Sequence, residues 1–173
     1  MDFLVQILYV LSWLVLLKFL QVSLYPILGP HLGKLAYPVS FSGGILAFSG
    51  LSWYLGLLRL PVALAALPFL GLLGRALLTH RYRREDLKPH LRWDLVFLGA
   101  FTAMLIVRLG NPAILGAEKF MDHAFMASIM RSPVVPPPDP WYAGGTMNIY
   151  YYGGYWMTGA LGILSGVPSP VVF

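Results

Sequence analysis

Residues 3 to 24 read FLVQILYVLSWLVLLKFLQVSL, an apolar run in which Lys18 is the only charged residue. A helix needs roughly 20 mostly apolar residues to cross the hydrocarbon core of a bilayer, and this run meets that length. Its apolar residues are continuous rather than alternating, which favours a helix over a strand of a membrane barrel. Four further segments approach the same length, at residues 39–58, 60–79, 93–109 and 149–168. The sequence therefore predicts an all-α protein, a polytopic bundle of transmembrane helices.

The composition also indicates a membrane protein. Apolar residues make up 58% of the chain and charged residues 11%, with a mean hydropathy of +0.70. Soluble domains are about 25% charged, so most of this chain is suited to lipid as its solvent. The absence of cysteine excludes disulfides and thiolate metal sites.

The cationic residues are clustered in a way that indicates membrane topology rather than nucleic-acid binding. The net charge is +5, and half of the twelve cationic residues lie in one short segment: Arg75, Arg81, Arg83, Arg84, Lys88 and Arg92. By the positive-inside rule the loop 80–92 is cytoplasmic. The next span, 93–109, then places the loop 110–148 on the extracytoplasmic side. We expect a multi-pass protein of the cell membrane.

Two connections and one end of the chain affect the number of spans. The segments 39–58 and 60–79 are joined with almost no linker, so they form either a tight hairpin of two spans or one kinked, re-entrant segment. The first helix is expected to stop at Tyr25, because proline at position 26 disfavours helix in the residue before it. The last segment, 149–173, is apolar to its final residue, so we expect further helices beyond it.

The loop 110–148 is the polar exception in this chain, and it contains one predicted helix. From 117 to 131 apolar residues recur at helical spacing, which predicts a short helix lying at the membrane interface. Glu118 and Asp122 are four residues apart and therefore share one face of that helix, with Lys119 and His123 in the adjacent row. The two carboxylates could bind a divalent cation, Mg²⁺ or Mn²⁺, or one could act as a general base. The alternative is a solvated polar face at a helix start.

A proline-rich run and a set of aromatic residues follow. Prolines at 136, 137, 138 and 140 force a stiff, extended path that holds Asp139 in place and is followed by Trp141. Asp139 could act on a substrate, or it could simply cap a turn in a surface linker. Asn148 and three tyrosines, Tyr150, Tyr151 and Tyr152, then open the last segment, where aromatic side chains also suit the headgroup region.

These motifs, Glu118 to Asp122, Arg131 to Pro133, Pro136 to Gly145 and Asn148 to Gly153, resemble the signature of the YYY family of prokaryotic membrane proteins. Members of that family are usually longer and carry many helices. Their organisation is similar to that of the C-type membrane glycosyltransferases, whose first large outer loop carries acidic residues beside a lipid-phosphate sugar donor. Residues 1–92 resemble the family only in being hydrophobic.

The resemblance implies roles for particular residues. Glu118, Asp122 and Asp139 would be catalytic, Glu118 and Asp122 would be metal ligands, and the partner would be a membrane lipid such as a polyprenyl-phosphate sugar. The implied substrate-binding residues are Lys119 and Arg131 at the phosphate, with Trp141, Asn148, Tyr150, Tyr151 and Tyr152. This sequence differs from the glycosyltransferase pattern at one point that concerns the catalytic base. The pattern has two adjacent acidic residues, whereas this chain has Glu118 followed by Lys119.

Two other classes of function are weighed against the enzyme. A transporter needs ionisable residues inside its spans, and here these are nearly confined to Lys18, Arg75 and Asp94, which we expect near helix ends. A non-catalytic scaffold would need only close helix contacts, such as the face formed by Gly162 and Gly166.

Overall fold

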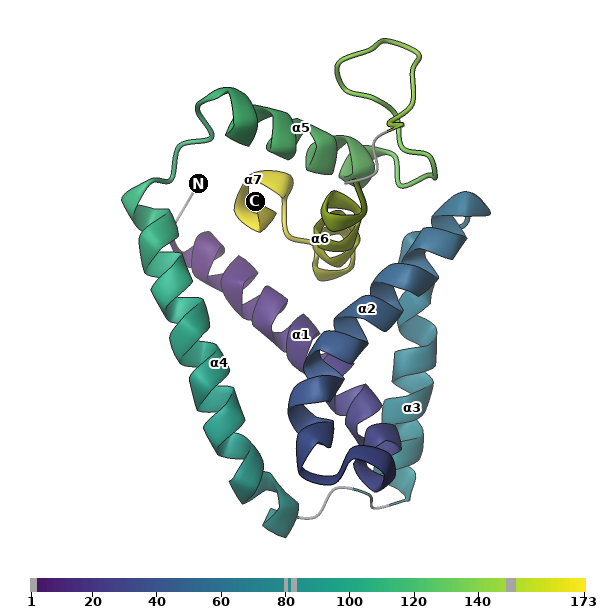
Figure 1. Cartoon of the computed structure of the whole chain (residues 1–173), viewed down its shortest axis with the longest axis vertical. Helices are drawn as coiled ribbons and strands as arrows, with labels where there is room; N and C mark the ends of the chain where they lie inside the picture. The colour runs from purple at the N-terminus through teal and green to yellow at the C-terminus, as the bar shows by residue number, and fades with distance from the viewer. Residues whose placement is uncertain (1–2, 80, 82–83, 149–151) are drawn as a thin grey trace.

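The computed structural model describes residues 3–79, 81, 84–148 and 152–173, and within these ranges the chain is helical and contains no β-strand (Figure 1). The all-α prediction is confirmed. The helices are α1 (Phe3–Leu32), α2 (Ala36–Leu57), α3 (Leu67–Leu78), α4 (Arg84–Gly110), α5 (Ala117–Arg131), α6 (Tyr152–Ser165) and α7 (Ser169–Val172), with 3₁₀ turns η1 (Gly33–Leu35) and η2 (Val62–Ala66).

Helices α1 and α2 form the closest pair in the fold. A Cβ added at Gly44 on α2 would stand 2.9 Å from the carbonyl oxygen of Leu20 on α1, so the two backbones approach too closely for any larger residue. Such contacts between small residues are a common way of packing helices in a membrane, because dispersion forces act best at short distance. Helices α3 and α6 pack on this pair, and α5 packs on α6 and α7.

The core centres on Trp156 of α6, which is 2% exposed. Its ring fills the space beside Gly56 on α2, where an added Cβ would stand 2.4 Å from the indole. The indole N–H donates a hydrogen bond of 3.1 Å to the hydroxyl of Ser52, so the buried polar atom is satisfied. Phe48, Phe69, Phe125 and Ile129 complete this cluster from α2, α3 and α5.

Helix α5 crosses one end of the bundle, over α6 and α7, and α4 stands beside α1 at the edge (Figure 1). The apolar stretch of α4, His90–Gly110, has no buried residue. Side chains such as Val96, Met104 and Ile106 are each about two-thirds exposed, at 65%, 67% and 64%. In water this surface would be costly, whereas lipid solvates it.

Two expected boundaries are wrong. Helix α1 does not stop at Tyr25 but continues to Leu32 through Pro26 and Pro30. In this part of α1 Tyr25 packs edge-on against Tyr37 of α2, with ring centroids 5.5 Å apart, and tertiary contacts routinely override local preferences. The segment 60–79 is not one continuous helix, since the 3₁₀ turn η2 precedes the 12-residue α3.

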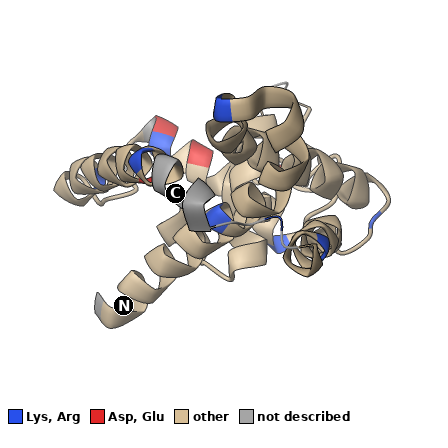
Figure 2. Cartoon of the chain, turned by 90° about the horizontal axis from the view of Figure 1, so that it is seen from below, with Lys and Arg blue, Asp and Glu red and all other residues tan. Residues whose placement is uncertain are grey.

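Among the described residues, two helical stretches are long and apolar enough to cross a membrane. Leu4–Leu57, in which η1 joins α1 to α2, and His90–Gly110 are long and apolar enough, whereas Val62–Leu78 is shorter. Helix α6 has 14 residues and ends before Gly166, whose φ is +69°. Seen from below, charged residues are sparse on the ribbon (Figure 2). The protein is an all-α membrane helix bundle, and the placement of its five expected spans stays a prediction.

Candidate functional site

The corner between α5 and α6 holds the acidic residue of most interest. Asp122 is half-buried on α5, and its carboxylate accepts a hydrogen bond from the hydroxyl of Tyr155 on α6. Tyr155 in turn packs against Phe125, with ring centroids 5.7 Å apart, so its hydroxyl is held in position. A carboxylate fixed in this way at the bundle end is suited to orient or deprotonate a hydroxyl group.

Glu118 lies one turn earlier on α5 and is exposed. In the part of the chain that the structure describes, no three His, Cys, Asp or Glu side chains gather closely enough to hold a metal ion. Glu118 and Asp122 thus have no third side-chain ligand there. Mg²⁺ often uses only one or two protein carboxylates and takes substrate phosphates and water as its other ligands, so a cation at this pair stays a prediction.

Asp139 is held by the turn in which it lies. Its Oδ1 accepts a 2.8 Å hydrogen bond from the backbone N–H of Trp141, and its own N–H donates to the carbonyl of Gly145 at 3.0 Å. This is the capping arrangement weighed in the sequence as the alternative to a catalytic role. Trp141 is 55% exposed and meets Phe120 of α5 edge-on, with centroids 5.5 Å apart.

The 132–148 loop is tied to both α5 and α2. The hydroxyl of Ser128 on α5 donates to the carbonyl of Pro138 at 2.7 Å. The backbone N–H of Val135 donates to the carbonyl of Gly56 at the end of α2, at 3.2 Å. Met147 is 2% exposed and binds the carbonyl of Pro137 through its N–H at 2.7 Å, which closes the loop on itself. The loop is therefore a folded part of the bundle end.

The remaining predicted binding residues are spread over this end. Lys119 is half-buried, whereas Arg131 and Asn148 are exposed. The hydroxyl of Tyr152 accepts a 3.3 Å hydrogen bond from the indole of Trp53, which links α6 to α2. Tyr150 and Tyr151 lie outside the described residues.

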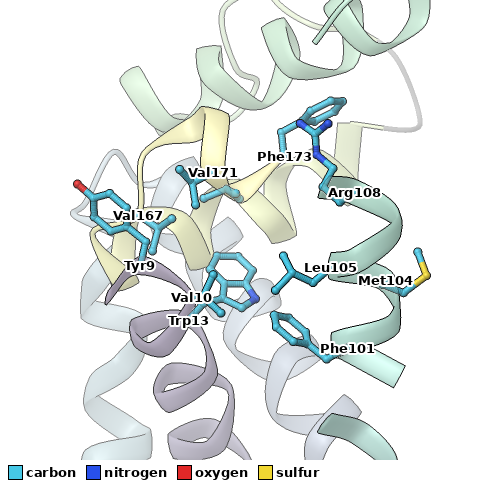
Figure 3. Close-up of a pocket in the computed structure, with 11 residues that line it drawn as sticks. Tyr9, Val10, Trp13, Phe101, Met104, Leu105, Arg108, Val167, Val171 and Phe173 are labelled. Carbon is cyan, nitrogen blue, oxygen red and sulfur yellow. The ribbon is translucent and has the colours of Figure 1, made fainter. Parts of the chain in front are cut away.

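A cavity of about 360 Å³ opens on the α5 side of the bundle, between α1, α4 and the segment 167–173 (Figure 3). We call it the α1–α4 cavity. Among the described residues that line it, the polar groups are the Tyr9 hydroxyl, the Trp13 N–H and the guanidinium of Arg108, and Arg108 alone is charged. The residues that line it are Tyr9, Val10, Trp13, Phe101, Met104, Leu105, Arg108, Val167, Val171, Val172 and Phe173.

Arg108 connects this cavity with α5. Its guanidinium donates a 2.7 Å hydrogen bond to the carbonyl of Asn111 and lies 5.7 Å from the ring centroid of Phe173. That ring lies 5.6 Å from the ring of His123, the neighbour of Asp122. The Nε2 atom of His123 is buried and has no hydrogen-bond partner among the described residues, and burial lowers the pKa of the imidazole. The cavity thus ends at one permanent cation, close to a histidine whose pKa is lowered by burial.

Sequence reasoning missed a second polar centre, the Lys18–Asp94 network. Lys18 lies in the middle of α1 rather than near its end, because the helix continues to Leu32. Its ammonium group is 2.5 Å from Asp94 Oδ1 on α4 and also donates to Gln21 and Tyr37. The available signal was the occurrence of two opposite charges in apolar segments, which usually pair.

Arg108 was missed for a related reason. In the sequence it is one cation among the charges around the outer loop, and nothing near it in the chain marks it as special. Its role as the charged group of the cavity follows only from the fold, which places α1 and the segment 167–173 beside it.

The comparisons with known proteins give one match. Residues 45–173, about three-quarters of the chain, match a family described as "uncharacterized membrane protein (DUF2298)". Neither the curated proteins nor the solved structures give a match to this chain. The matched part includes α4, α5, the 132–148 loop and α6. The chain therefore belongs to the DUF2298 family of membrane proteins.

Proposed function

We propose that this protein acts on a lipid-linked sugar phosphate, in the manner of the C-type membrane glycosyltransferases that its loop motifs resemble. The observation that supports this most strongly is the α1–α4 cavity, an apolar hollow that ends at the guanidinium of Arg108 on the α5 side. Such a hollow matches an amphiphile with an apolar chain and an anionic head. The 110–148 loop would face the extracytoplasmic side, opposite the basic segment 80–92.

The dimensions and chemistry of the cavity fit part of such a lipid. Its volume of about 360 Å³ lies at the lower end of the range for small-molecule sites, enough for a portion of a polyprenyl chain. The chain would lie against Trp13, Phe101 and Leu105. Arg108 would bind the phosphate, for which a planar guanidinium offers two parallel N–H donors.

Asp122 is the carboxylate best suited to be the base. In the proposed transfer the acceptor hydroxyl attacks the anomeric carbon of the sugar, and its proton passes to the Asp122 carboxylate. The bond between that carbon and the phosphate oxygen breaks, and the electron pair leaves with the lipid phosphate, whose charge Arg108 stabilises. Attack opposite the leaving group inverts the configuration of the anomeric carbon.

The other predicted residues take supporting roles in this proposal. Lys119 on α5 would add positive charge near the phosphate, and Trp141 and Asn148 would contact the sugar or acceptor. If a divalent cation is bound, Glu118 and Asp122 would hold it together with phosphate oxygens, where it would supply further positive charge. His123 would remain neutral near neutral pH because burial lowers its pKa.

The test is photolabelling of the full-length protein in membranes with a polyprenyl phosphate that carries a photoreactive group. Arg108→Gln is expected to lower labelling by roughly tenfold, the effect of losing a charge-assisted pair. Arg75→Gln removes an exposed cation from α3 and is the matched control, with labelling unchanged. Labelling that survives in Arg108→Gln, or that falls equally in both variants, would contradict the proposed phosphate site.

A further inference from the structure

The Lys18–Asp94 network brings three helices together. Lys18 and Gln21 come from α1, Tyr37 from α2 and Asp94 from α4. The three N–H donors of the Lys18 ammonium reach Asp94 Oδ1 at 2.5 Å, the Tyr37 hydroxyl at 2.8 Å and Gln21 Oε1 at 3.0 Å. Asp94 Oδ2 lies 2.9 Å from the Tyr37 hydroxyl. Both charged groups are therefore satisfied by one another and by neutral partners.

The Lys18 and Asp94 side chains are 41% and 36% exposed, and their pairing links α1 to α4. A charge in a membrane span is costly unless its hydrogen-bonding capacity is met. Here the lysine has used all of its donors, and Gln21 is fixed by a 3.0 Å hydrogen bond from its Nε2 to the Tyr37 carbonyl. Gln21 and Tyr37 are 4% and 5% exposed, so the partners of the ion pair are held by packing.

Helix α4 is attached to the α1–α2 pair mainly through its amino-terminal half. The described contacts come from His90, which stacks on Tyr37 at 4.1 Å, from Asp94 in the network, and from Phe97, whose ring lies 4.7 Å from Phe41. Among the residues that the structure describes, Lys18 and Asp94 form the one ion pair.

The carboxyl-terminal half of α4 faces a hollow instead of a packed neighbour. Phe101 and Leu105 point into the α1–α4 cavity opposite Val10 and Trp13 of α1, whereas Met104 points outward from α4 (Figure 3). The spacing of the two helices along the cavity is thus not fixed by direct packing there. Arg108 in this half meets Phe173 of the carboxyl-terminal segment, 5.7 Å from its ring centroid, whereas the described contacts of α4 with the α1–α2 pair lie in its other half.

We infer that Lys18 and Asp94 are positioning residues: their pairing fixes the distance of α4 from α1 and so sets the width of the α1–α4 cavity and the place of Arg108. Arg108 follows Asp94 by fourteen residues on the same helix, which is roughly 21 Å along its axis. A small tilt about the Asp94 end becomes a larger displacement at that distance. The inference concerns helix spacing and holds whether or not the cavity takes a lipid phosphate.

The test measures that spacing by cysteine crosslinking. The chain has no cysteine, so any crosslink comes from the introduced pair of cysteines. Val10→Cys with Leu105→Cys places one thiol on each wall of the cavity, and a bifunctional thiol reagent bridges the space between them. Ile129→Cys with Gly159→Cys is the control pair on α5 and α6, where an added Cβ at 159 stands 3.6 Å from the Ile129 Cβ, within the range for a disulfide.

Asp94→Asn and Lys18→Met should each lower crosslinking of the cavity pair by roughly tenfold, because each leaves one charge in an apolar helix without its partner. The exchange K18D with D94K should restore it, and Lys18→Arg, which keeps the charge, should retain it. The control pair should crosslink equally in every variant. Unchanged crosslinking of the cavity pair in the single variants, no recovery in the exchange, or an equal fall in the control pair would overturn the inference.

Discussion

The hydroxyl of Tyr155 on α6 donates a hydrogen bond to the carboxylate of Asp122 on α5. This bond connects the helix that lies across the bundle end with the helix that carries the core tryptophan. If Asp122 is the base, Asp122→Asn should lower lipid-linked sugar turnover by about 100-fold or more, the usual contribution of a positioned base. Tyr155→Phe should lower it by roughly tenfold, because the carboxylate loses its orienting partner.

The control for that pair of variants is Tyr142→Phe, which removes the hydroxyl of a tyrosine that is 71% exposed in the 132–148 loop. Turnover should be unchanged in it. Full turnover in Asp122→Asn would remove the residue from the mechanism and direct attention to Glu118.

Asp139→Asn distinguishes the two interpretations of that residue. An asparagine keeps an oxygen that can accept the N–H of Trp141, so the turn should survive and turnover should stay within about twofold of the parent. Asp139→Ala should lower the melting temperature, since it leaves the turn uncapped. A loss of turnover in Asp139→Asn by orders of magnitude, with the fold intact by circular dichroism, would instead mark Asp139 as catalytic.

Gly56→Ala should destabilise the protein because an added Cβ would stand 2.4 Å from the indole of Trp156. Overpacking of this kind costs about 1–3 kcal/mol. Gly50→Ala is the matched variant on the same helix, with nothing within 4 Å of the added Cβ, and should be neutral or stabilising. Unfolding in mixed detergent micelles measures both, and equal midpoints would refute the tight contact.

His123 should make stability depend on pH in one direction. Burial lowers the pKa of its imidazole in the folded protein, so the unfolded chain takes up a proton more readily. Its contribution to stability is therefore complete above the unfolded pKa of about 6.5 and is lost as the pH falls from there towards the lowered folded value. The parent should lose more stability than His123→Gln between pH 7.5 and 5.5.

The comparison for this pH effect is His31→Gln, which replaces an exposed histidine on α1. Its change in melting temperature between the two pH values should match that of the parent. If His123→Gln also matches the parent, burial of the imidazole does not govern the pH dependence.

The sequence predicted those features that depend on neighbouring residues, such as helix bounds and turn caps. The helix at 117–131 follows from apolar residues at helical spacing, and α5 has those bounds. The same reasoning failed at Pro26, where α1 stays helical to Leu32 and Tyr25 contacts Tyr37 of α2. It also recognised that Asp139 could cap a turn, which depends only on the next two residues.

Relationships between distant residues could not be predicted in this way. Lys18 and Asp94 are 76 positions apart, and the pairing depends on how α1 and α4 are placed. The α1–α4 cavity likewise needs residues from both ends of the chain, from Tyr9 to Phe173. A single sequence carries no signal for such juxtapositions beyond the unusual presence of charge in an apolar segment.

The hydrogen bonds that tie the 132–148 loop to Gly56 on α2 and to Ser128 on α5 make that loop a rigid strut between two helices. A loop bonded to both helices in this way moves with each of them, so a displacement of one helix displaces the other. Detergents or lipids that shift the end of α2 should therefore also shift α5 near Ser128, and a pair of spectroscopic labels on α2 and α5 would record the change.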